Sequence, residues 1–82
     1  MMTTHERRQL QDERNRLRRM NQVALERGIE ANNRAAEFLE AWEPPEIEKA
    51  REEQRRADRY FALSDRTHHQ LCEIIERLGM RW

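Results

Sequence analysis

The side chains best suited to acid–base or metal chemistry gather near the C-terminal end of the chain. His68, His69, Cys72 and Glu73 follow one another at helical spacing. His69 and Glu73 together supply only two metal ligands, where a zinc site needs three or four. Cys72 has no companion base on a rigid loop, so a buried structural thiol explains it better than a nucleophile does. Since a glycine-rich phosphate loop is also lacking, we expect no enzymatic activity, no metal and no cofactor.

A second group of side chains combines arginines with one aromatic ring. Arg59 directly precedes Tyr60, and Arg66 and Thr67 lie about two helical turns further on. A guanidinium group binds phosphate oxygens through parallel hydrogen bonds, and an aromatic face stacks on a base. The segment therefore has the groups needed to hold a small anionic nucleotide between subunits. The same residues also fit a simpler arrangement, a core tyrosine flanked by solvated arginines, and composition alone favours this simpler arrangement.

Arginines are also frequent in the first twenty residues. The bases there are Arg7, Arg8, Arg14, Arg16, Arg18 and Arg19, and the acids are Glu6, Asp12 and Glu13. This mixture indicates either a solvated helical face, which we favour, or a surface that binds RNA phosphates. Because the chain balances 16 bases against 16 acids, it lacks the positive charge typical of a nucleic-acid-binding protein.

Two glycines and two prolines are the few breaks in the 82 residues, and they limit the helices. Thr3 and Glu6 form a capping-box pattern, which satisfies free amide groups where a helix begins. Gly28 is expected to lie within the first helix without ending it, so the chain first breaks at Pro44-Pro45. A proline disfavours helical geometry in the residue before it and suits the first turn of a new helix. We therefore predict a first helix over residues 3–42 and a second over residues 45–78.

The second helix is expected to end at Gly79, because glycine readily adopts the left-handed conformation that closes a helix. Met80 would then fold back on Ile75. With no other break in the chain, the sequence predicts an all-α fold: one domain over residues 1–82, built as an antiparallel two-helix hairpin.

Folding the chain at Pro44 pairs residue i with roughly residue 88 minus i. Gly28 then lies opposite Phe61, where a small residue makes room for a large one. Asn21 lies beside His68, and a polar pair at this place would fix the register of the helices. The predicted seam of the second helix keeps steps of three and four residues: Ile47, Ala50, Gln54, Ala57, Phe61, Ser64, His68, Leu71, Ile75 and Leu78.

Apolar residues outside this seam predict that hairpins assemble into a homo-oligomeric helical bundle. The second helix has a further stripe of Tyr60, Leu63, Thr67, Leu71, Ile74 and Leu78. The first helix has a surplus at Met20, Val23, Leu25, Ile29, Ala36 and Leu39. We expect Met20, Val23, Leu63, Ile74 and Leu78 to form the oligomer interface.

The charges favour an antiparallel arrangement of such hairpins. Residues 1–19 hold six arginines against three acids, and residues 55–82 hold six bases against four acids. Residues 26–53, around the turn, hold four bases against nine glutamates. An antiparallel pair of hairpins would place each acidic end beside a basic end.

Two short motifs are similar to those of a known family. Arg59-Tyr60-x-Ala62-Leu63, followed by Arg66-Thr67-x-x-Gln70, resembles the second-helix signature of the phage anti-CBASS cyclic-nucleotide sponges, a hairpin family shared with some anti-Thoeris sponges. Met20-Asn21-Gln22-Val23 before Gly28 resembles the Met-Asn-x-Val of the family's first helix. Tyr60 stands where the family has tryptophan, and Ala24 falls near its pocket lysine, which leaves Arg27 or Arg19 as the substitute.

The resemblance implies a non-enzymatic homo-oligomer, a hexamer in that family, which binds cyclic oligonucleotide immune signals between protomers. The ligand-binding residues would be Arg59, Tyr60, Arg66, Thr67, Asn21 and Arg27. The lone Cys72 fits a reducing compartment, and we expect the cytoplasm of an infected bacterial host. The alternatives are a helical inhibitor that buries an apolar stripe against a host protein and an RNA-binding hairpin dimer. The sequence does not name the nucleotide or the host protein, and it leaves the number of subunits open.

Overall fold

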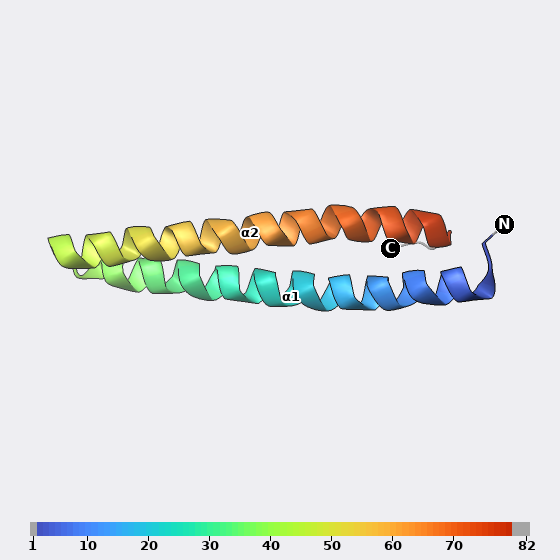
Figure 1. Ribbon diagram of the computed structural model, residues 1–82. Coiled ribbons are helices and arrows are strands. Elements are labelled where there is room, and N and C mark those ends of the chain that lie inside the picture. Colours follow the sequence, from blue (N-terminus) through green and yellow to red (C-terminus); the bar gives the residue numbers. More distant parts are fainter. Residues whose placement is uncertain (1, 80–82) are drawn as a thin grey trace.

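Two long helices make up the computed structural model, which describes residues 2–79. Helix α1 covers Thr4–Glu40 and helix α2 covers Pro44–Leu78. They run side by side in opposite directions, so that the start of α1 and the end of α2 lie at the same end of the hairpin (Figure 1). The predicted all-α antiparallel hairpin is therefore confirmed. It measures 61 × 16 × 14 Å, and its radius of gyration of 17.9 Å exceeds the value of about 12 Å for a compact domain of this length.

The helix ends follow the local signals in the sequence. Thr3 caps α1, and its hydroxyl accepts a hydrogen bond of 3.2 Å from the backbone N–H of Glu6. Gly79 ends α2 in the left-handed conformation, with φ of 67°. The expected contact between Met80 and Ile75 lies outside the described residues.

The turn is slightly longer than predicted. Helix α1 ends at Glu40, two residues before the predicted end, and α2 begins one residue early, at Pro44. Trp42 has a positive φ of 54° and is 80% exposed. The reversal of the chain at this residue turns the indole into solvent.

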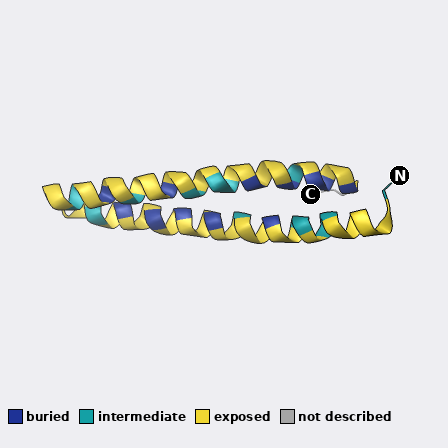
Figure 2. Ribbon diagram, in the orientation of Figure 1, coloured by how far each residue is buried: buried dark blue, intermediate teal, exposed yellow. Residues whose placement is uncertain are grey.

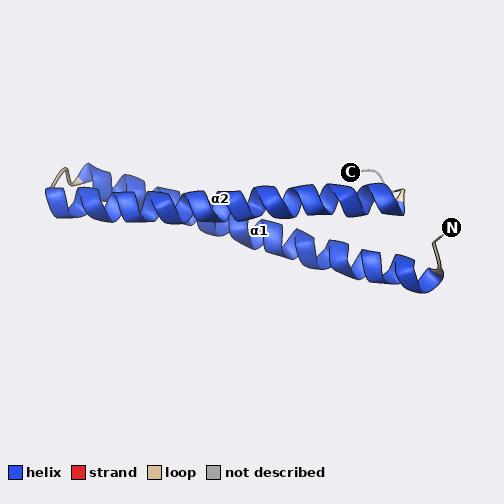
Figure 3. Cartoon of the chain, turned by 45° about the horizontal axis from the view of Figure 1, so that its top comes forward, coloured by secondary structure: helices blue, strands red, loops and turns tan. Residues whose placement is uncertain are grey.

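The core is a narrow seam between the helices (Figure 2). From α1 it takes Leu17, Ala24, Gly28, Ala31 and Ala35. From α2 it takes Ala50, Ala57, Thr67, Leu71, Ile74, Ile75 and Leu78. The turn half is thus packed with alanine and glycine, and the terminal half with leucine and isoleucine. The ribbons accordingly diverge toward the termini (Figures 1 and 3), as expected because larger side chains hold helix axes further apart.

The predicted seam of α2 is half right. Ala50, Ala57, Leu71, Ile75 and Leu78 are buried as predicted, but Gln54, Phe61 and His68 are exposed. At these three places the inward-facing residue lies one position earlier in the sequence, at Glu53, Tyr60 and Thr67, and Ile74 is buried beside Ile75. The sequence did not fix this phase, because apolar or aromatic residues occur in adjacent pairs at 60–61 and 74–75.

The expectation that Ile74 and Leu78 face a second subunit is wrong. Both are buried within the hairpin, in a cluster with Leu17, Leu71 and Ile75. Leu10 and Met2 pack against this cluster and cover it from the α1 side. The N-terminal segment therefore supplies apolar cover that we did not assign to it.

The expected surplus on α1 is present. Met20, Val23, Leu25, Ile29 and Leu39 are between 38% and 48% exposed. The pairing of Gly28 with Phe61 is also confirmed, since a Cβ atom at Gly28 would lie 2.7 Å from Cε1 of Phe61. Among the described residues, no helix has the length and apolar character needed to cross a membrane.

Candidate ligand-binding groove

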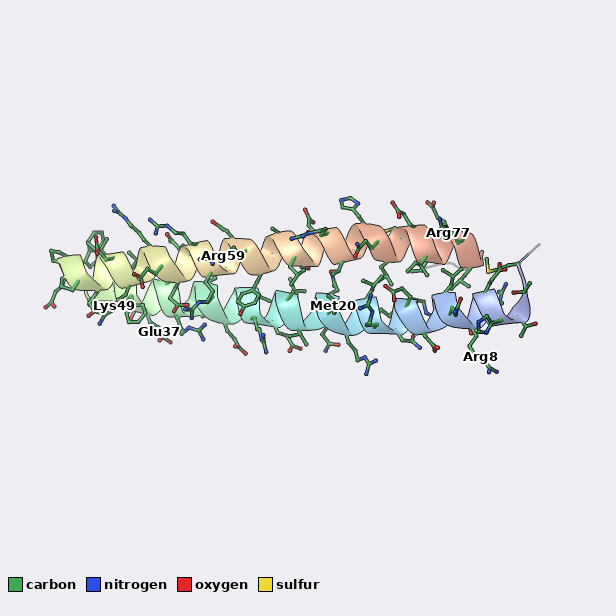
Figure 4. The ribbon with its side chains drawn as sticks, in the orientation of Figure 1. Arg8, Met20, Glu37, Lys49, Arg59 and Arg77 are labelled. Carbon is green, nitrogen blue, oxygen red and sulfur yellow. The ribbon has the colours of Figure 1, made fainter. Side chains whose placement is uncertain are left out.

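A small groove opens at mid-length, where α1 and α2 begin to diverge. Its volume is about 280 Å³, and it is lined by Arg19, Met20, Val23, Ala24, Arg27, Tyr60 and Leu63. Figure 4 labels Met20, which lies on α1 in this central part of the hairpin. The apolar side chains form its surface, with a guanidinium group on the helical turn before Val23 and another on the turn after it.

The groove exists because a small residue lies between larger ones. Ala24 is 2% exposed and places only a methyl group between the helices. Met20, Val23 and Arg27 follow one another at three- and four-residue steps, so they share one flank of α1. Tyr60 and Leu63, three residues apart on α2, form the opposite wall, and both are half-buried.

Three arginines of the described residues are held by carboxylates of the same hairpin. Glu13 binds Arg16, which raises the pKa of that guanidinium through a side-chain hydrogen bond and its negative charge. Glu53 binds Arg34 at 3.2 Å and Arg56 at 3.3 Å. These arginines are therefore already neutralised within the hairpin.

The arginines of the groove differ in this respect. Within residues 2–79, Arg19 and Arg27 form no ion pair, and the same holds for Arg59 and Arg66. An arginine without an acidic partner keeps its hydrogen-bond donors available for an external anion. The groove thus joins an apolar floor and a tyrosine ring to available positive charge.

Arg59 and Arg66 do not line the groove. Both are exposed, and they lie four residues before and three residues after Leu63, on the same flank of α2. Figure 4 labels Arg59 on α2, in the central part of the hairpin. They border the groove on its outer side, where they can contact only a ligand that extends beyond it.

Asn21 and Thr67 are used inside the hairpin. The amide of Asn21 donates to the backbone oxygen of Ser64 at 2.7 Å and to the hydroxyl of Thr67 at 3.1 Å. The hydroxyl of Thr67 donates to backbone oxygens one turn earlier, and Thr67 is only 2% exposed. The expectation that Thr67 binds a ligand is therefore wrong, and the amide nitrogen of Asn21 is already engaged.

The predicted pairing of Asn21 with His68 is also wrong. Because the seam of α2 lies one residue earlier, Thr67 takes the place we assigned to His68. His68 is exposed, and its Nε2 lies 3.7 Å from the Sγ of Cys72. Cys72 itself is half-buried. In the part of the chain that the structure describes, no three metal-binding side chains come together.

The structure therefore regroups the candidate residues. Tyr60 and Arg27, from the ligand set, lie together with Met20, Val23 and Leu63, from the interface set. Sequence reasoning missed Ala24 as the floor of a groove and gave Arg19 only a secondary place. The sequence pattern that indicates the groove is a small residue at the inward position, Ala24, beside the larger residues Met20, Val23 and Arg27 on the neighbouring flank of the helix.

Comparison with known protein families, with characterised proteins and with solved structures finds no match to this chain.

Proposed function

We propose that this protein is a non-enzymatic binding protein that takes up a cyclic nucleotide, or a related nucleotide signal, in the groove between α1 and α2. The observation that carries the proposal is the placement of Tyr60 beside an apolar groove with Arg19 and Arg27. An aromatic ring binds the face of a base, and guanidinium groups bind phosphate oxygens. The mixture is typical of sites for planar, anionic ligands.

The size of the groove supports a site for one nucleotide unit. Its volume of about 280 Å³ lies just below the range of about 300–1,000 Å³ found for small-molecule sites. A cyclic dinucleotide or trinucleotide would extend beyond it, toward Arg59 and Arg66. These two arginines would then contact the second phosphate, and the groove would hold the first base.

The biological setting belongs to the same proposal. A small protein that binds a signalling nucleotide without chemistry lowers its free concentration, and a phage-type protein of this kind would starve a bacterial defence effector. It would act in the cytoplasm of the infected host, where the signal is made. The motifs at Arg59-Tyr60 and Met20-Asn21 support this reading, with Asn21 acting on the fold instead of the ligand.

The direct test is a thermal-shift panel of cyclic dinucleotides and trinucleotides, followed by calorimetry with any nucleotide that raises the melting temperature. A ligand that binds only the folded state raises this temperature by mass action. Arg27→Ala should weaken binding by about 2 kcal/mol, because a charge-assisted hydrogen bond is lost. Tyr60→Leu should also weaken it, since stacking on one base contributes about 1–3 kcal/mol.

Arg18→Ala is the matched control, because Arg18 is exposed on the same helix but does not line the groove. It should bind with wild-type affinity. Equal losses for Arg18→Ala and Arg27→Ala would indicate general attraction between charges and not a site. No binding of any nucleotide by the wild type would reject the proposal and favour a protein partner.

A further inference from the structure

The two flanks of α1 differ sharply in charge. The flank at the groove consists of the residues that each precede an inward-facing residue of α1 by one position. They are Met20, Val23, Arg27, Glu30, Arg34 and Glu37. Four of these six are charged. The other flank consists of the residues that each come one position after an inward-facing residue. They are Gln22, Leu25, Ile29, Asn32, Ala36 and Leu39. None of these six is charged, and we call this set the outer face.

The outer face has the spacing of a second coiled-coil seam. Its steps of three, four, three, four and three residues match those of the inward seam, displaced by one residue. All six residues are exposed, and Leu25 and Ile29 are 43% and 48% exposed. On the same side of α2, Phe61 is 36% exposed where it packs against Gly28. A charge-free and mainly apolar strip of this kind is typical of the centre of a protein interface.

The hairpin exposes enough surface to form a stable interface with a partner. The hairpin exposes 6633 Å², whereas a compact monomer of its 10.1 kDa would expose about 5,300 Å². The excess of about 1,300 Å² is more than the roughly 800 Å² that each partner buries in an interface of standard size.

Charge identifies a suitable partner. The turn half holds nine glutamates against four bases, and both terminal segments carry a net positive charge. A second copy in the same direction would place acidic half on acidic half. In the opposite direction, with Leu25 of each copy against Ile29 of the other, the acidic half of each faces the basic half of the other. Glu40 would then lie level with Arg14 of the partner subunit.

We propose that the outer face binds a second copy of this chain in antiparallel orientation, about a two-fold axis near Leu25, Ile29 and Phe61. The pairing does not depend on nucleotide binding, because the groove lies on the other flank of α1 and stays open in the pair. Two hairpins joined in this way form a four-helix arrangement, in which each copy covers the other's exposed apolar strip.

Sedimentation velocity of the full chain tests the interface through a matched pair of substitutions. Ile29→Glu introduces a charge on the outer face, and Val23→Glu introduces the same charge on the groove flank, at a residue of similar exposure. The wild type should sediment as a pair or a multiple of one at micromolar concentration. Ile29→Glu should at least halve the mass and raise the dissociation constant by 100-fold or more, whereas Val23→Glu should retain the wild-type mass.

Two outcomes would overturn the proposal: a wild type that is monomeric at 100 µM, or dissociation by Val23→Glu and not by Ile29→Glu. Circular dichroism of each variant shows whether the helices are retained. A dissociated Ile29→Glu chain that is still helical supports the proposal.

A distance measurement keeps the proposal testable even if Ile29→Glu does not fold. Asp12→Cys in a Cys72→Ser chain offers one site for a spin label on an exposed residue. Asp12 lies 15 residues from the axis, so the two labels of an antiparallel pair should be about 45 Å apart along the helices at 1.5 Å per residue. A distance below about 25 Å would indicate a parallel pair and contradict the proposed orientation, and the lack of any distance would contradict the pair itself.

Discussion

In the turn half, residues 24–35 of α1 meet residues 50–57 of α2 through alanine and glycine. In the terminal half, Leu17 of α1 meets residues 71–78 of α2 through leucine and isoleucine side chains. The turn half gains its stability from close approach of the two backbones, since its side chains bury little apolar area. The terminal half gains it from buried aliphatic side chains, at a wider separation. The two halves should therefore respond in opposite ways to a change of side-chain volume.

The groove lies where one mode of packing gives way to the other. Ala24 is the last small residue of the close-packed half on α1, and the seam continues toward the N-terminus with Asn21 and Leu17. Tyr60 and Leu63 follow Ala57 on α2. At such a junction the axes are already separating but the side chain between them is still a methyl group. An opening beside Ala24 follows from that geometry.

Removing volume from the terminal half should have the largest effect on stability. Leu71 is 4% exposed in the aliphatic cluster, so Leu71→Ala should lower the free energy of unfolding by about 2–5 kcal/mol. Leu39→Ala makes the same change at a residue that is 38% exposed and should cost less than half as much. Urea unfolding at one fixed protein concentration measures both. Equal losses would show that burial in the aliphatic cluster does not account for the cost of Leu71→Ala.

Adding volume to the turn half should come next in size. A Cβ atom at Gly28 would already lie 2.7 Å from the ring of Phe61, so Gly28→Leu should cost about 1–3 kcal/mol despite the better helix propensity of leucine. The cost should fall in a Phe61→Ala chain, where the space is open. A double-mutant cycle measures this coupling, and additive effects would place the strain elsewhere.

The polar contact between the halves should contribute less. Asn21→Ala removes a donor to Ser64 and Thr67, but the hydroxyl of Thr67 keeps its bonds to backbone oxygens. We expect a loss of about 1 kcal/mol, the usual contribution of one hydrogen bond. Gln22→Ala, at the neighbouring exposed residue, serves as the control and should be nearly neutral. A larger loss of unfolding free energy for Gln22→Ala than for Asn21→Ala would show that contacts of the outer face, and not the hydrogen bonds of the seam, stabilise this part of the hairpin.

How far the sequence predicts this molecule depends on whether a feature is local. Thr3, Gly79 and the proline pair act on the backbone next to them, and they set the helix ends to within one or two residues. The pairing of Gly28 with Phe61 followed from the position of the turn alone. These features require no knowledge of how the helices rotate against each other.

Rotation of the helices was the part that the sequence left open. Tyr60-Phe61 and Ile74-Ile75 offer apolar or aromatic side chains at adjacent positions, so either phase of α2 buries a similar amount of apolar surface. The hydrogen bonds of Asn21 to Ser64 and Thr67 belong to one phase only. The groove and the burial of Ile74 both follow from that phase, which is why the predicted site and interface were regrouped.

Arg59→Ala should have the smallest effect on folding, and it tests whether the groove is extended along α2. Arg59 is exposed and forms no ion pair within residues 2–79, so its loss should leave the circular dichroism and the melting temperature nearly unchanged. Because it borders the groove without lining it, we expect a loss in nucleotide affinity of about 1 kcal/mol, smaller than for Arg27→Ala.

The loss should be confined to cyclic dinucleotides and trinucleotides, since a mononucleotide would not extend far enough to reach this side chain. Arg59→Lys should restore part of the affinity, as an ammonium group keeps the charge but lacks the two parallel donors. Calorimetry of these variants with a cyclic dinucleotide and with its mononucleotide separates the two cases: an equal loss for both ligands would move Arg59 into the groove itself, and no loss for either would limit the site to the junction of the two halves.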